Sequence, residues 1–200
     1  FGDESQGQRK FKFLSGNECE NLGFWRSLPV EHGRAIPACG PLSVEFITEH
    51  LSTNQDNVSF GQRSYSPFDS PPRTRRQVHT GGLTNQDQVS SMLDESGLNP
   101  TTVGNEEIKN QWRRNFTSQA LSTLRDNRCI MFSVEHPHLA GHWLVMLKDF
   151  DDTSTNNEYA CVYDSYTGNV WKLPWSLLNT WFNRYEANEK YVPESVVIVQ

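Results

Sequence analysis

The chain has 200 residues, a formal net charge of −6 and 12% aromatic residues. That length suits one domain with a substantial hydrophobic core. The acidic balance argues against a general nucleic-acid binder, which would present a basic face, and no apolar run approaches the length of a membrane span. We therefore expect a single domain over residues 1–200 that binds neither nucleic acid nor a membrane.

The four cysteines, Cys19, Cys39, Cys129 and Cys161, lie far apart and form no CxxC pair. This spacing is typical neither of a disulfide scaffold nor of a zinc site. Cys129 and Cys161 stand inside apolar, strand-like runs, so we expect both in the core. We expect no metal and no other cofactor.

The first quarter of the chain predicts little regular structure before one helix. Alternating apolar residues over Phe11–Leu14 favour a short edge strand. Residues 16–38 read as a loop-rich lead-in that Trp25 and Leu28 anchor to the core. A mostly apolar helix then begins near Cys39 and runs to about Leu51. Residues 52–82, which are rich in Ser, Asn, Gln, Pro and Arg, predict a long loop inserted into the domain.

Three helical patterns follow this insert. Thr84 resembles a helix start and Gly97 a stop, with Val89, Met92 and Leu93 as the apolar face between them. Ile108, Trp112 and Phe116 recur every four residues, which predicts a second helix. Ala120, Leu121 and Leu124 predict a further short one.

The remainder of the chain is dominated by strand patterns. The Asp164–Gly168 turn joins two of the strands as a hairpin, and helical spacing returns over Trp175–Tyr185. Helices followed by an antiparallel sheet predict an α+β fold. The predicted strands are Cys129–Val134, Trp143–Leu147, Tyr159–Tyr163, Asn169–Leu173 and Val196–Val199.

Cys39 stands where a loop enters the first turn of its helix, just before Gly40 and Pro41. A thiol at a helix start feels the positive end of the macrodipole and unpaired backbone N–H groups, which favour the nucleophilic thiolate. The same amides can hold an oxyanion. The alternative is that Cys39 is simply a small buried hydrophobic residue.

A cysteine nucleophile needs a base and a group that orients the base. Among the six histidines, His142 is placed best, because it follows Gly141 and opens the buried strand Trp143–Leu147. Asp164 ends a neighbouring strand, so a hairpin would bring both side chains to one end of the sheet. Taken singly, His142 is better explained as a structural histidine and Asp164 as a turn opener. Their order and local contexts together favour catalysis.

These residues resemble the papain-like cysteine peptidases. The resemblance rests on Cys39-Gly40-Pro41 at a helix start, Gly141-His142-Trp143 entering a strand, and Asp164-Ser165-Tyr166-Thr167-Gly168 after the next strand. It is nearest to the bacteriocin-processing branch that cuts double-glycine leaders. It covers about residues 36–168, the insert 52–82 excepted.

The resemblance implies a papain-like fold in which a helical half carrying the nucleophile packs on an antiparallel sheet carrying His and Asp. It implies Cys39 as nucleophile, His142 as general acid and base, and Asp164 as orienter. The family usually has a glutamine six residues before the cysteine, where this chain has Gly33. Either His32 substitutes in the oxyanion hole beside the Cys39 amide, or a donor comes from elsewhere in the chain, or backbone N–H groups form the hole.

Three functions stay open on this evidence. The first is a peptidase that cleaves a protein substrate, after Gly-Gly in a narrow cleft walled by Trp143 and Tyr166. The second is a glutamine deamidase that uses the same three residues, and the third is a catalytically inactive binding module. A secreted bacterial effector or toxin, delivered to a target cell and neutralised by an immunity or inhibitor protein, fits the first two. No signal peptide is visible, so a cytoplasmic protein stays an alternative.

Overall fold

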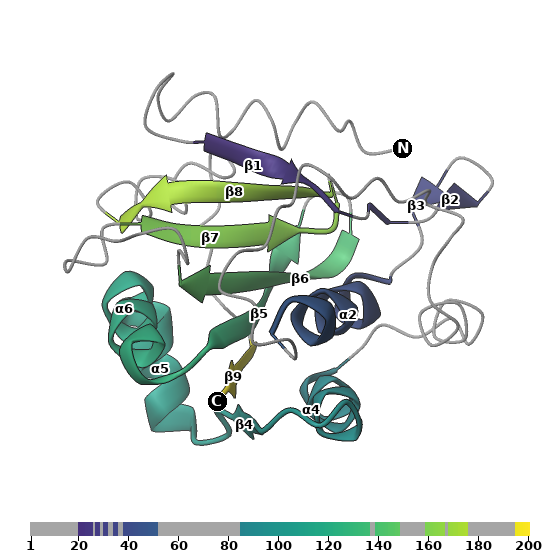
Figure 1. Ribbon diagram of the computed structural model, residues 1–200. Coiled ribbons are helices and arrows are strands. Elements are labelled where there is room, and N and C mark those ends of the chain that lie inside the picture. Colours follow the sequence, from purple (N-terminus) through teal and green to yellow (C-terminus); the bar gives the residue numbers. More distant parts are fainter. Residues whose placement is uncertain are drawn as a thin grey trace.

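A computed structural model describes residues 20–25, 27–28, 30–31, 34–35, 38–51, 85–136, 139–148, 159–166, 168–175 and 195–200. Over these residues the chain forms a seven-stranded antiparallel sheet in the order β1-β8-β7-β6-β5-β9-β4, with helices on both faces (Figure 1). The sheet strands are β1 (Glu20–Phe24), β4 (Pro100–Thr102), β5 (Cys129–His136), β6 (Leu139–Lys148), β7 (Tyr159–Asp164), β8 (Asn169–Pro174) and β9 (Ser195–Val199). The short strands β2 (Val30–Glu31) and β3 (Arg34–Ala35) pair separately. The helices are α2 (Cys39–Leu51), α4 (Gln86–Glu95), α5 (Glu106–Arg114) and α6 (Phe116–Asp126).

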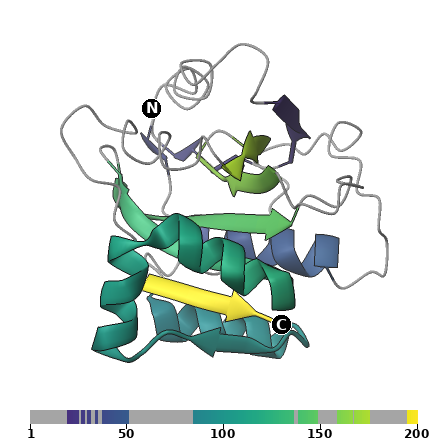
Figure 2. The same ribbon diagram turned by 90° about the vertical axis from the view of Figure 1, so that its left-hand side faces the viewer.

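The sheet separates two hydrophobic layers. Along β5, Cys129 and Met131 pack with the residues of α2 and α4, whereas Ile130 and Phe132 pack with those of α5 and α6. This alternation follows from the two-residue period of a strand. The two helix pairs therefore cover opposite faces of the sheet, as the two views show (Figure 1 and Figure 2).

Helix α2 is the most buried of the described helices because its sequence is apolar on nearly every side. Leu42, Val44, Phe46 and Ile47 are all fully buried. The Leu42 N–H donates to the Ala38 carbonyl at 2.9 Å, which closes the first turn. The predicted helix from Cys39 to Leu51 is confirmed.

Helix α4 begins one residue later than the pattern at Thr84 predicted. Asn85 is its N-cap, and the Asn85 side chain accepts from the Gln88 N–H while the Gln88 side chain accepts from the Asn85 N–H. This reciprocal pair satisfies two amide donors at the helix start. The predicted stop at Gly97 is confirmed, since Gly97 has a φ of 80°, which glycine adopts without a Cβ penalty.

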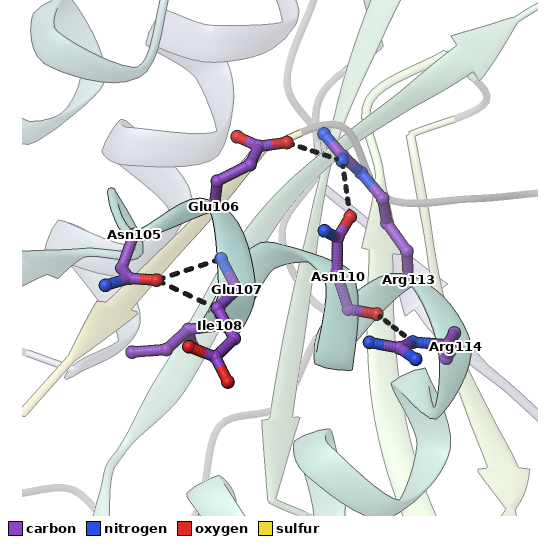
Figure 3. A network of polar contacts seen from close by, with 7 residues as sticks. All are labelled: Asn105, Glu106, Glu107, Ile108, Asn110, Arg113 and Arg114. Carbon is purple, nitrogen blue, oxygen red and sulfur yellow. Dashed lines mark hydrogen bonds and ion pairs between the residues drawn. The ribbon is translucent and has the colours of Figure 1, made fainter.

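The two predicted helices, one through Ile108 and Trp112 and one over Ala120–Leu124, both form, but Phe116 belongs to the second and not to the first. The helical conformation is interrupted at Asn115, whose φ of −135° and ψ of 51° are not helical, and Phe116 begins α6. Ile108 was expected on the buried face but is 44% exposed. Polar contacts explain why α5 still forms: Asn105 caps it, and Glu106 pairs with Arg113 at 3.1 Å (Figure 3).

The predicted α+β fold is confirmed, with the helix that carries Cys39 packed on an antiparallel sheet. The five predicted strands all form. Four further strands were not predicted: β1 shows no clear alternation, β4 is a three-residue edge strand opening at Pro100, and β2 and β3 have only two residues each. Val196–Val199 belongs to β9, which was expected as the last strand of the sheet but lies between β5 and β4 and is not at its edge. Phe11–Leu14, the insert 52–82 and most of Trp175–Tyr185 lie outside the described residues.

Candidate active site

Cys39 opens helix α2 and is 4% exposed. The first amides of a helix have no acceptor within it, and Pro41 has no N–H to offer. The Leu42 N–H already donates to the Ala38 carbonyl. The helix donors nearest to the thiol are therefore those of Cys39 and Gly40, the groups that an oxyanion beside Sγ would meet.

The pairing of β6 with β7 brings His142 to Asp164. Leu144 pairs with Asp164 across the two strands, which makes Asp164 the diagonal neighbour of His142, within side-chain reach. The His142 Nε2 and Asp164 Oδ1 atoms lie 2.6 Å apart. Both residues are buried, with His142 0% and Asp164 1% exposed, so water does not compete for this contact. The hairpin pairing expected of these two strands is confirmed.

Cys39 is the third residue of the site, and it contributes to the pKa of the His142 imidazole. Burial lowers the pKa of His142, but the charge and hydrogen bond of Asp164, together with a hydrogen bond and charge from Cys39, raise it from 6.5 to about 10. Since Nε2 faces Asp164, Nδ1 is the ring nitrogen left to exchange a proton with the thiol. At neutral pH the site therefore favours an imidazolium beside the Asp164 carboxylate.

Asp164 also opens the turn that follows β7. Its Oδ1 accepts from the Tyr166 N–H at 2.9 Å, and its carbonyl accepts from the Gly168 N–H at 2.8 Å. Gly168 closes the turn with a φ of 80°, which glycine tolerates. The two roles weighed for Asp164, turn opener and partner of His142, are thus compatible, and the turn fixes the carboxylate that faces the imidazole.

Of the two aromatic residues predicted to wall a substrate cleft, one contacts the histidine. The Tyr166 ring meets the His142 ring edge to face with centroids 6.3 Å apart, and Trp143, which follows His142 in β6, is buried. Tyr166 thereby covers the imidazole, while a role for either residue in substrate selection stays a prediction. His32, the side chain suggested for the oxyanion hole, lies outside the described residues.

Trp25 and Leu28 do more than anchor the lead-in. The backbone N–H of Trp25 donates to the Gly168 carbonyl, and the backbone N–H of Leu28 donates to the Ser165 carbonyl, each at 2.8 Å. Together they hold both ends of the turn that begins at Asp164. Their apolar character signalled burial in the sequence, but nothing local indicated which turn they would hold.

The other described cysteines show no sign of reactivity. Cys129 and Cys161 are buried, as predicted. Burial raises the pKa of the Cys129 thiol well above its ordinary value, against a smaller lowering by the charge of Arg128. In the described ranges no cluster of three metal-ligating side chains occurs. Those ranges also hold no helix of the length and hydropathy that a bilayer crossing requires.

Comparison with known proteins finds a likeness to solved structures but no relative by sequence. No protein-family model matches the sequence, and no curated protein matches it. The fold is similar to that in the crystal structure of the Pseudomonas avirulence protein AvrPphB, with a TM-score of 0.48 and 14% sequence identity, covering 95% of this chain and 99% of that one.

Proposed function

We propose that this protein is a thiol hydrolase that cleaves peptide bonds through Cys39, His142 and Asp164. One observation carries the proposal: the buried His142 imidazole contacts the Asp164 carboxylate at 2.6 Å through Nε2, and Cys39 at the start of α2 is among the groups that raise the pKa of that imidazole. A structural histidine needs only one such partner. A nucleophile, a base and a group that orients the base are the three parts that covalent catalysis by cysteine requires.

The residues would divide the acylation step between them. The Cys39 thiolate attacks the carbonyl carbon, forming a C–S bond while the carbonyl π electrons move to oxygen. The amides of Cys39 and Gly40 stabilise this oxyanion. His142, protonated at Nδ1, gives its proton to the amide nitrogen, the C–N bond breaks, and the amine departs to leave a thioester.

Hydrolysis of the thioester reverses these roles. Neutral His142 takes a proton from water at Nδ1, and the resulting hydroxide attacks the thioester carbon. The C–S bond breaks, the acid product leaves, and the thiolate again faces an imidazolium. Asp164 stays ionised throughout and keeps the other ring nitrogen, Nε2, protonated, which fixes the tautomer that both steps need.

The proposed substrate is a protein cleaved after small residues. Cys39, His142 and Asp164 are all at most 4% exposed, so only a slender segment of chain reaches the thiol without rearrangement. Gly-Gly is the sequence implied by the resemblance to the double-glycine peptidases. Papain-like bacterial effectors and toxins resemble the same set of residues, and a toxin of this kind would have a neutralising protein partner.

Proteomics of new N-termini tests this proposal directly. Cells expressing the wild-type protein are compared with cells expressing Cys39→Ala, and with Cys129→Ala as a control that removes a buried cysteine outside the site. We expect new N-termini with wild type and Cys129→Ala and none with Cys39→Ala. New termini that persist with Cys39→Ala would refute the assignment, and large residues before the cut would remove the Gly-Gly proposal.

The same atoms would also deamidate glutamine, because a side-chain amide can replace the peptide bond in the acylation step. The geometry of the three residues does not favour one amide over the other. Intact-mass analysis of target proteins separates the reactions: deamidation leaves the backbone whole and adds about one mass unit by exchanging an amide for an acid.

A further inference from the structure

Three aromatic rings connect the elements that carry the candidate catalytic residues. Phe46 of α2 stacks on Tyr163 of β7, with centroids 4.3 Å apart and planes inclined by 7°. Trp25 packs edge-on against both rings, at 5.4 Å from each. All three side chains are fully buried. We call Trp25, Phe46 and Tyr163 the aromatic cluster.

Each ring is linked through the backbone to a different part of the site. Phe46 lies two helical turns after Cys39, about 10 Å along the same face of α2. Tyr163 directly precedes Asp164 in β7. The N–H of Trp25 donates to the carbonyl of Gly168, which ends the Asp164 turn. The three rings are therefore joined, through short stretches of backbone or one backbone hydrogen bond, to the Cys39 helix, to Asp164 and to the end of the Asp164 turn.

We infer that the aromatic cluster positions the Cys39 helix against the Asp164 strand, so that thiol, imidazole and carboxylate meet in one geometry. Trp25, Phe46 and Tyr163 are then positioning residues, which touch neither substrate nor reacting atoms. The inference rests on the proposed function, because it assigns the cluster to the Cys39–His142–Asp164 site.

Physical reasons favour rings over aliphatic side chains at these positions. Stacked and edge-on pairs have defined separations and angles, whereas branched aliphatic chains repack with more freedom. A helix tethered by such a stack resists sliding along the sheet. A shift of about 1 Å at a reacting group typically costs a hundredfold in rate, so even a small slide would matter.

The test measures the reaction of Cys39 with a thiol-directed disulfide at about pH 5.5, where only a thiol paired with a cation reacts quickly. Tyr163→Leu removes the stack and Tyr163→Phe retains it. Phe46→Met is a milder second variant should Tyr163→Leu fail to fold. Phe132→Leu is the matched control, because Phe132 is equally buried but packs with Phe116 on the other face of the sheet. Thermal unfolding of every variant is recorded alongside.

We expect Tyr163→Leu and Phe46→Met to slow the labelling of Cys39 by about tenfold or more. The labelling rate of Cys39 in Tyr163→Phe should stay within about threefold of the wild-type rate. The rate in Phe132→Leu should also stay within about threefold, even if the melting temperature of Phe132→Leu falls as much as that of Tyr163→Leu. Labelling that survives loss of the stack, or that falls equally in Phe132→Leu, would overturn the positioning role while leaving the proposed function intact. A wild-type Cys39 that labels no faster than Cys129 would overturn the proposed function itself.

Discussion

Replacing Asp164 by asparagine removes one negative charge from the site while keeping an oxygen at nearly the same place. The amide oxygen can still accept from the Tyr166 N–H, which Asp164 Oδ1 does at 2.9 Å, so the turn is retained. The contact to His142 Nε2 also stays possible as a neutral hydrogen bond. Asp164→Asn therefore isolates the electrostatic contribution of the carboxylate.

The structure sets the size of the expected effect. The pKa of His142 is raised from 6.5 to about 10, although burial lowers it, and the charge of Asp164 is the largest of the raising causes. At about 1.4 kcal/mol for each pKa unit, the difference corresponds to about 5 kcal/mol in favour of the imidazolium. Without that charge, burial is opposed only by the hydrogen bond to residue 164 and by Cys39, so we expect the pKa of His142 to fall well below its wild-type value.

Heteronuclear NMR of the imidazole ring nitrogens measures this pKa without a substrate. The protein is labelled at histidine and titrated from about pH 5 to pH 11, and the His142 signals are assigned by their loss in His142→Gln. In wild type the ring should stay protonated through neutrality. In Asp164→Asn it should titrate near or below neutrality, and the remaining histidines should keep their midpoints.

Two results would refute this reasoning. The first is a wild-type midpoint near the ordinary value of 6.5, which would mean that the carboxylate does not hold an imidazolium. The second is a midpoint that Asp164→Asn leaves unchanged, which would assign the raised pKa to some other group.

Three further outcomes test the linkage between protonation and stability and the local rules of the fold. Because the folded-state pKa of His142 is raised, its stabilisation is complete below pH 6.5 and is lost as the pH rises through about 10. The difference in unfolding free energy between wild type and Asp164→Asn, measured by denaturant titration, should shrink as the pH rises from 6.5 to about 10. A difference that stays constant over this pH range would contradict the linkage. Gly97→Ala should cost about 1–2 kcal/mol because Gly97 has a φ of 80°, whereas Gly104→Ala, with equally open space around its Cβ, should stay within about 0.5 kcal/mol by thermal unfolding. Asn85→Ala breaks the reciprocal cap with Gln88 and should cost about 1 kcal/mol in the same assay; no loss would show that the cap is dispensable.

The parts of the site that the sequence predicted are those with a local signal. Gly40 and Pro41 mark a helix start, so Cys39 could be placed at the N-terminus of α2. The turn residues after Tyr163 predicted a hairpin end, and antiparallel pairing then brought Asp164 to His142. In each case the interaction that sets the position of the residue joins residues close together in the sequence or follows from the pairing of neighbouring strands.

The parts that were missed depend on contacts between distant segments. Strand β1 forms because β8 pairs with it, and its own sequence shows little alternation. Trp25 was predicted to be buried, but its contacts with Phe46 and Tyr163 are settled only by tertiary packing. The break at Asn115 was hidden because Phe116 continued the spacing of the preceding helix while belonging to the next one.

The central claim is that Cys39 and His142 act as a pair, and the labelling of Cys39 at about pH 5.5 in His142→Ala tests it most directly. Cys129 serves as an internal control, because burial raises the pKa of its thiol and keeps it unreactive. The account predicts that Cys39 in the wild type reacts far faster than Cys129, and that His142→Ala slows Cys39 by about tenfold or more while the protein stays folded. A Cys39 that reacts equally fast without the imidazole would contradict it.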